Sequence, residues 1–81
     1  MILSRKQQEK LLRFGYRARI WALFHLNPNQ FFTVEEISEI TGLKSSTVEQ
    51  GLKFIRHLPF IETRVKYETN EKIVHYGFVP V

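Results

Sequence analysis

A glycine turn between two short amphipathic segments, within residues 33–58, constrains this chain more than any other feature of its sequence. Thr33 and Glu36 have the spacing of a capping box, in which each side chain accepts a hydrogen bond from the other residue's backbone N–H. Gly42 predicts the end of the first helix, because glycine adopts the left-handed conformation at little cost. We therefore expect two helices joined by a tight turn.

The segment after the turn predicts a second helix with one apolar face aimed at the first. The apolar positions recur at i, i+4 and i+7: Val48, Leu52 and Ile55. Two starts for this helix remain open. In one, Ser46 is the cap and Glu49 completes a second capping box. In the other, Lys44 is the cap and Leu43 packs on Val48 as a hydrophobic staple.

This pair of helices resembles the helix-turn-helix of the winged helix-turn-helix DNA-binding regulators of bacteria and archaea. The resemblance covers residues 31–79 and is carried by Ile37-Ser38, Gly42-Leu43, Thr47-Val48, Leu52 and Ile55. Lys44 and Gly51 depart from the family pattern, which usually has serine at the first position and a polar residue at the second. The resemblance implies an α+β, mostly helical winged helix-turn-helix with three helices and a C-terminal β-hairpin wing, as one domain over residues 1–81.

The N-terminal part of the chain, residues 4–27, predicts one long helix that ends at Asn27-Pro28. Its first half carries a basic stripe, interpreted either as a solvated face or as a contact to the DNA backbone: Lys6, Lys10, Arg13 and Arg17. Its second half is apolar nearly all round and must be covered on every side. We expect a homodimer packed through this helix, with the C-terminal strands as the alternative cover. The candidate interface anchors are Phe14, Trp21 and Phe24.

The C-terminal residues 60–79 predict a β-hairpin. Residues 60–68 alternate between apolar and charged side chains, which is typical of a half-buried strand. The turn is expected at Thr69-Asn70-Glu71, because asparagine tolerates the left-handed conformation. Residues 72–79 form the returning strand, and Pro80 ends the pairing because it has no N–H to donate. By resemblance to the family, this hairpin is the wing, and residues 30–32 form a small strand against it.

Composition limits the classes of function. The chain has 12 Lys and Arg against 8 acidic residues and a net charge of +4, which suits a polyanionic partner. It has no cysteine, and the three histidines, His25, His57 and His75, fall on different predicted elements, so we expect no metal, no cofactor and no enzymatic activity. The N-terminus lacks the apolar core of a signal peptide and no apolar run could cross a membrane, so we expect a cytoplasmic protein without a membrane partner.

These features together predict a small transcription regulator that binds double-stranded DNA sequence-specifically, with the second helix of the pair in the major groove. The expected contacts from this recognition helix are Lys44, Ser45, Ser46, Thr47, Glu49, Gln50 and Lys53. By resemblance, the wing contributes Arg64, Lys66 and Lys72 at the backbone or minor groove. For each residue the alternative is ordinary exposed surface.

A winged-helix module that binds protein within a larger complex is the alternative function. An acidic side formed by Glu35, Glu36 and Glu39 and an aromatic content of 14% favour it. The position of the basic residues distinguishes the two hypotheses, since DNA binding predicts one continuous basic surface: Lys10, Arg13, Arg17, Lys53 and Lys66.

Overall fold

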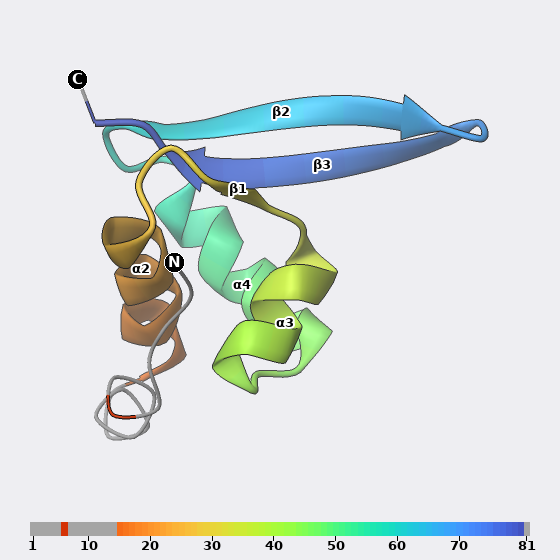
Figure 1. Cartoon of the computed structure of the whole chain (residues 1–81). Coiled ribbons are helices and arrows are strands. Elements are labelled where there is room, and N and C mark those ends of the chain that lie inside the picture. Colours follow the sequence, from red (N-terminus) through yellow and green to blue (C-terminus); the bar gives the residue numbers. More distant parts are fainter. Residues whose placement is uncertain (1–5, 7–14, 81) are drawn as a thin grey trace.

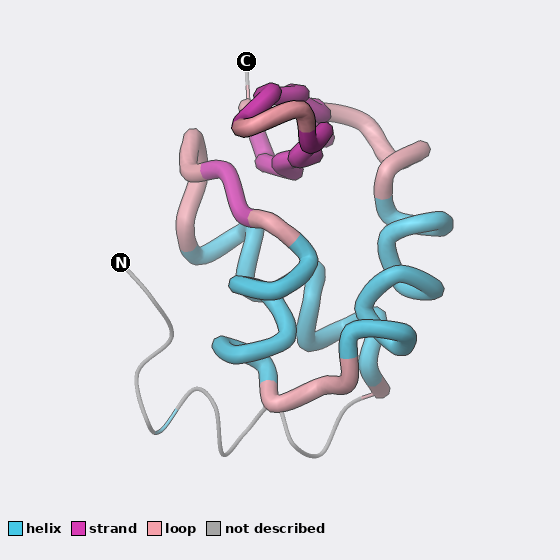
Figure 2. The backbone as a smooth tube through the Cα atoms, turned by 90° about the vertical axis from the view of Figure 1, so that its right-hand side faces the viewer, coloured by secondary structure: helices cyan, strands magenta, loops and turns pink. Residues whose placement is uncertain are grey.

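The computed structural model describes residue 6 and residues 15–80. Residues 15–80 form the helices α2 (Tyr16–Leu26), α3 (Val34–Thr41) and α4 (Ser45–Ile55) and the strands β1 (Phe31–Phe32), β2 (Ile61–Glu68) and β3 (Glu71–Phe78). The strands pair antiparallel in the order β1-β3-β2. The sheet crosses one end of the helical layer, and the β2–β3 hairpin extends beyond it (Figures 1 and 2). This small α+β domain has an element order compatible with the predicted winged-helix layout.

The hydrophobic core forms where the helices meet the root of the sheet. Every described element except β2 contributes to it, and Ile61 of β2 packs against its edge. The buried apolar side chains are Ile20, Leu23, Phe24, Phe32, Ile37, Val48, Leu52, Ile55 and Phe78. The three residues at the predicted i, i+4 and i+7 positions of the second helix are therefore in the core, as expected.

The predicted features of the first helix of the pair are confirmed. The Thr33 hydroxyl accepts a hydrogen bond from the Glu36 N–H at 3.1 Å, and the Glu36 carboxylate accepts one from the Thr33 N–H at 3.0 Å. Gly42 ends α3 with a φ of 74°, in the left-handed region. The Ser38 hydroxyl donates to the Leu43 carbonyl across this turn, so Ser38 is both small enough for close packing and a hydrogen-bond donor that holds the turn.

The structure decides between the two predicted starts of the second helix. Lys44 is the N-cap and α4 begins at Ser45. Among the described residues, no side chain accepts a hydrogen bond as a cap at this end, because lysine has no acceptor atom. Leu43 packs against the core together with the buried Val48, as the staple alternative requires. The start of α4 is thus held by apolar packing.

The prediction of one continuous helix over residues 4–27 is wrong at Gly15. Gly15 is the N-cap of α2 and has an extended conformation, with φ −63° and ψ 166°. Glycine loses more conformational entropy in a helix than any other residue, and so favours a break there. The C-terminal boundary is confirmed, because α2 ends at Leu26 with Asn27 as its cap.

The C-terminal strands cover α2 on one side, as predicted by the alternative to the homodimer. The Phe78 ring of β3 packs on Trp21, with ring centroids 5.8 Å apart, and on His25 at 4.5 Å. Of the predicted dimer anchors, Phe24 is fully buried in the core of its own chain and cannot act as one. Trp21 is half-buried, and Phe14 lies outside the described residues.

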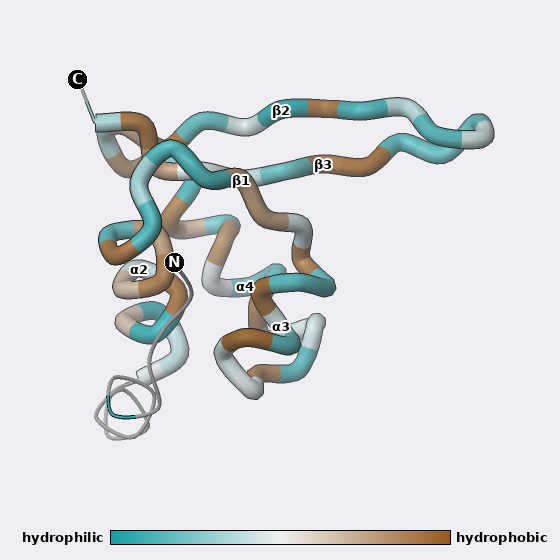
Figure 3. The backbone as a smooth tube through the Cα atoms, viewed as in Figure 1, coloured by the Kyte–Doolittle hydropathy of each residue, from teal (hydrophilic) through white to brown (hydrophobic). Residues whose placement is uncertain are grey.

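The predicted hairpin is present, with a turn one residue shorter than expected because Glu71 already belongs to β3, but its outer part is not half-buried. Glu68 pairs with Glu71, so Thr69 and Asn70 form a two-residue turn, with φ values of 48° and 65° that match a type I′ turn. Val65 and Tyr67 are 44% and 74% exposed, because the hairpin runs past the helices (Figure 1). The prediction of a half-buried strand therefore holds only at the root, and the tip is hydrophilic (Figure 3).

Gly51 marks the closest approach between α2 and α4. A Cβ atom at this position would lie 2.6 Å from the Ile20 Cδ1 atom and 3.4 Å from the Tyr16 ring. Ile20 is fully buried and has little room to move. The departure from the family pattern at Gly51 thus has a packing reason, which offsets the low helix propensity of glycine.

We expect Gly51→Ala to destabilise the protein. Alanine is favoured over glycine within a helix by about 1 kcal/mol, but overpacking a core costs about 1–3 kcal/mol, so the net loss in the free energy of unfolding is at most about 2 kcal/mol. Urea denaturation measures it. The double variant Ile20→Val/Gly51→Ala lacks the colliding Cδ1 atom and should be more stable than the sum of the single changes predicts. Strict additivity would contradict the contact.

Candidate nucleic-acid interface

The exposed side of α4 is polar except at Phe54. Val48, Gly51, Leu52 and Ile55 are buried on the opposite side. Of the predicted recognition-helix residues, Thr47 is half-buried and the others are exposed: Lys44, Ser45, Ser46, Glu49, Gln50 and Lys53. The structure therefore leaves nearly all of the predicted contact residues accessible.

Three of these residues form a line directly opposite the core. Ser46, Gln50 and Lys53 are spaced at i, i+4 and i+7, so their side chains lie above one another on one face of the helix. The line is narrow. Ser46 and Gln50 are uncharged, and Lys53 adds a positive charge at its end. A helix presented in this way has the shape and the hydrogen-bonding groups needed to enter the major groove of B-DNA.

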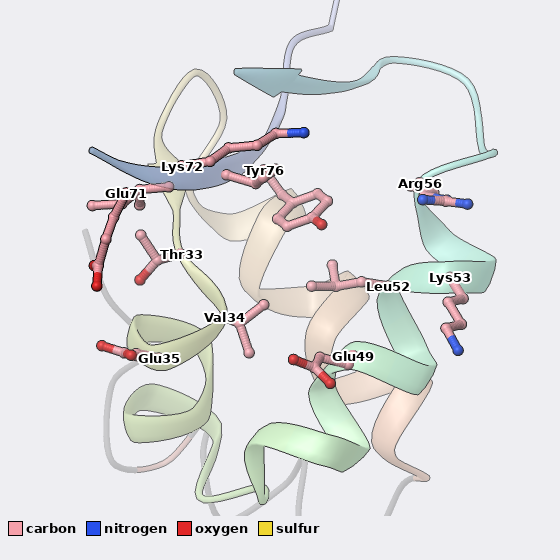
Figure 4. Close-up of a pocket in the computed structure, with 12 residues that line it drawn as sticks. Thr33, Val34, Glu35, Glu49, Leu52, Lys53, Arg56, Glu71, Lys72 and Tyr76 are labelled. Carbon is pink, nitrogen blue, oxygen red and sulfur yellow. The ribbon is translucent and has the colours of Figure 1, made fainter. Parts of the chain in front are cut away.

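A groove of about 630 Å³ runs between α4, the start of α3 and the β3 edge. Figure 4 shows Tyr76 above it and Leu52 below, with charged side chains around the rim. The basic side chains are Lys53, Arg56 and Lys72, and the acidic ones are Glu35, Glu49 and Glu71. Three positive charges thus face three negative ones, so the groove is not an anion-binding cleft.

The predicted wing residues lie on two different faces of the hairpin. Lys72 pairs with Tyr67 and shares the face that carries Tyr76 and Phe78 toward the helices. Arg64 and Lys66 lie on the other face. Of the three wing residues, only Lys72 therefore adds positive charge on the side of α4.

Arg64 has partners within its own chain. Its guanidinium lies 3.9 Å from the centroid of the Phe31 ring and 3.9 Å from a Glu62 carboxylate oxygen. Gly77 allows this arrangement, because a Cβ atom there would lie 2.8 Å from the Phe31 ring. Arg64 belongs to the middle of the sheet and not to the tip of the wing.

The basic stripe predicted on the N-terminal helix is not one continuous helical face. Lys10 and Arg13 lie outside the described residues, and Lys6 is exposed. Gly15 interrupts the helix before Arg17, which is exposed in the first turn of α2. Arg17 and Lys53 both lie along α4, whereas Lys66 is on the face of the sheet turned away from it, so the described members of the set do not form the one continuous basic surface that the DNA-binding hypothesis predicted.

Two further exposed residues lie beside the predicted contact residues of α4. Arg56 lines the groove, one turn after Leu52. Phe54 is 52% exposed although it is a large aromatic residue. Its position was detectable in the sequence, because it falls outside the i, i+4, i+7 pattern of Val48, Leu52 and Ile55. The acidic half of the groove was not, since its residues come from three separate elements.

Searches of protein-family models, of curated proteins and of solved structures each found no match to this chain. Within the described residues, no helix is long and apolar enough to span a membrane. The class of the protein must therefore be inferred from its own topology and side chains. These consist of a helix pair with an exposed polar second helix and a projecting hairpin beside it.

Lys44 is the N-cap of α4 and a predicted phosphate contact, and a substitution can separate the two. We expect Lys44→Ser to raise the free energy of unfolding by about 1 kcal/mol, because serine supplies the missing N-cap acceptor. If Lys44 contacts phosphate, the same change lowers the affinity for any duplex and reduces the salt dependence by about one unit of slope. Thermal denaturation and fluorescence anisotropy measure the two effects.

The matched control is Lys44→Ala, which removes the charge without adding a cap. It should lower duplex affinity as much as Lys44→Ser does, without the gain in stability. Unchanged affinity in both variants would exclude Lys44 from the DNA contact, and equal stability of the two would show that α4 gains nothing from a side-chain cap.

Proposed function

We propose that this protein is a small transcription regulator that binds double-stranded DNA sequence-specifically. In this proposal α4 enters the major groove and the β2–β3 hairpin lies against the neighbouring backbone or minor groove. The observation that carries it is the line of Ser46, Gln50 and Lys53, exposed on α4 directly opposite the core. The proposed roles follow from side-chain chemistry. Gln50 can pair bidentately with adenine, and Lys53 is suited to phosphate.

The shape of the domain supports the same proposal. The hairpin projects past the helices (Figure 1), and its β3 edge borders the groove on one side of α4, so a duplex that receives α4 also comes within reach of the wing. Lys72 faces this side and supplies a positive charge for the backbone. The net charge of +4 adds a long-range attraction that does not depend on sequence.

The experiment that tests the proposal is selection from a pool of random-sequence duplexes at two salt concentrations, followed by sequencing of the retained DNA. Enrichment of one sequence supports a specific regulator, and an inverted repeat with half-sites about one helical turn apart supports a dimer. Salt-sensitive retention without enrichment would indicate a non-specific nucleic-acid binder. Absence of retention at low salt would overturn the proposal.

Gln50 and Lys53 should respond differently to truncation. Gln50→Ala is expected to weaken binding to the selected sequence by roughly 1–3 kcal/mol and to change the preference at one base pair. Lys53→Ala should weaken binding to all duplexes alike and lower the salt slope by about one. Repeating the selection with each variant measures both effects. An unchanged preferred sequence for Gln50→Ala would exclude Gln50 from base recognition.

The proposal includes a homodimer packed through α2. The side of α2 turned away from the core carries small and apolar residues at i, i+4 and i+8, namely Ala18, Ala22 and Leu26, of which Leu26 is 44% exposed. Trp21 borders this side. Such a stripe is suited to the close packing of a second copy of the helix.

We expect Ala18→Glu to dissociate the dimer, because two carboxylates would then be buried close to the symmetry axis. Ala18 is exposed in the single chain, so the fold should be unaffected. Sedimentation equilibrium measures the association, and Gln30→Glu, in an exposed loop position, is the matched control. A monomeric unsubstituted protein at concentrations that saturate DNA would refute the interface.

A second candidate function is supported by the groove beside α4. Its balanced charges and apolar floor suit a polypeptide segment better than a phosphate backbone. The β3 edge next to the groove is the one that pairs with β1, and β1 pairs only with Tyr76 and Gly77. Among the described residues, positions 71–75 of this edge therefore have no strand partner. A protein-interaction module would use this groove and would show no duplex retention in the selection experiment.

A further inference from the structure

A cation and an exposed aromatic ring meet on the α2 side of α4. The Arg17 guanidinium carbon lies 4.7 Å from the centroid of the Phe54 ring and 5.7 Å from that of Tyr16. Phe54 is 52% exposed, so its ring is largely a surface feature. These distances are within the range of cation–π contacts. Arg17 is therefore held on the surface of α4 although it belongs to α2.

The contact lies next to the line of predicted base-contacting residues. Phe54 follows Gln50 by four positions and Lys53 by one, so its ring flanks that line on the side of α2. The closeness of the two helices at Gly51 brings the first turn of α2 to this point, with the Tyr16 ring 3.4 Å from the position of a Gly51 Cβ atom. The location of Arg17 is thus determined by the packing of the two helices.

The two flanks of α4 differ in charge. The groove on one flank contains the carboxylates of Glu35, Glu49 and Glu71. The other flank is formed by α2, whose residues 16–26 include no aspartate or glutamate. Among the described residues, no carboxylate lies within ion-pairing distance of Arg17. The α2 flank is therefore the one better suited to a phosphate.

A guanidinium stacked on a ring keeps its N–H groups available at its edges. These groups match the geometry of phosphate oxygens and can bind them bidentately. Stacking also fixes the orientation of a side chain that otherwise has many rotamers, which reduces the entropy lost when the contact forms. Without the contact between Phe54 and Arg17, the guanidinium would not be held in one orientation with its N–H groups available.

We infer that Arg17 contacts a phosphate at the α2 edge of the DNA-binding surface and that Phe54 is its positioning residue. This inference rests on the proposed binding of duplex DNA. The DNA footprint then extends from α2 across α4 to the wing, and its α2 edge is set by the Arg17–Phe54 stack. Phe54 itself makes no contact with the DNA and acts through Arg17.

The test measures binding of the full chain to a random-sequence duplex over a series of salt concentrations. The variants are Arg17→Gln, Arg17→Lys, Phe54→Leu and the double variant Arg17→Gln/Phe54→Leu. Phe60→Leu is the matched control, because Phe60 is equally exposed at 51% and packs on Phe78, at the root of the sheet. Circular dichroism and thermal denaturation establish that each variant is folded.

We expect Arg17→Gln to weaken binding several-fold on every sequence and to lower the salt slope by about one. Phe54→Leu should weaken binding while the slope stays the same, because the charge remains but is no longer oriented. Arg17→Lys should resemble Phe54→Leu. The double variant should bind no more weakly than Arg17→Gln alone, and Phe60→Leu should bind as the unsubstituted protein does.

The outcomes separate this inference from the proposed function. If the unsubstituted protein binds duplex DNA and Arg17→Gln changes neither affinity nor salt slope, the inference is overturned and the proposed function stands. Additive losses in the double variant would overturn the positioning role of Phe54. If the unsubstituted protein binds no duplex at low salt, both are overturned. Should Phe54→Leu fail to fold, the comparison of Arg17→Gln with Arg17→Lys still decides whether an oriented guanidinium matters.

Discussion

Burial of Phe78 is the constraint on which the arrangement of this domain depends. Its ring enters the core at the root of β3, contacts Trp21 and His25 of α2, and has Phe60 on its outer side. Its carbonyl accepts a hydrogen bond from the Asn29 N–H at 2.8 Å, which joins the loop after α2 to the sheet. Because β3 is the central strand, anchoring it also places both β1 and β2.

The position of the sheet in turn determines what α4 can present. α2 and α3 cover the apolar side of α4, the root of the sheet closes the same core, and the hairpin runs on past the helices into solvent (Figure 1). The side of α4 opposite the core is left as a narrow polar ridge with a different surface on each flank. One flank is a groove of balanced charge below β3, and the other is the basic and aromatic edge formed with α2. The proposed DNA contact uses the ridge, the α2 edge and Lys72 of the hairpin.

This asymmetry accounts for the mixed charge pattern of the sequence. The net charge of +4 is not spread evenly over the molecule, because acidic residues concentrate at the start of α3 and in the groove. Such carboxylates oppose phosphate entry into the groove and leave it available to a polypeptide. The two proposed functions share Lys53 and Lys72, which line the groove and belong to the proposed DNA contact, so a polypeptide in the groove would compete with DNA.

Local sequence was sufficient for the helix pair. The Thr33–Glu36 capping box, the left-handed Gly42 and the buried Val48, Leu52 and Ile55 were all predicted, because each depends on residues within one or two helical turns. The hairpin and the position of its turn to within one residue were predicted for the same reason. The exposed residues of α4 followed from periodicity once the buried face was known.

The other features depend on contacts between residues far apart in the chain. Sequence pattern treated residues 4–27 as one helix and Phe24 as an interface anchor, whereas the fold breaks the helix at Gly15 and buries Phe24 against its own chain. The sequence pattern also could not predict the exposure of Val65 and Tyr67 or the contact of Arg17 with Phe54. The sequence by itself therefore determined the elements and their polar faces, since capping and periodicity are local. Only the tertiary structure decided which faces are covered and which charges become neighbours, because burial depends on how the elements pack in space.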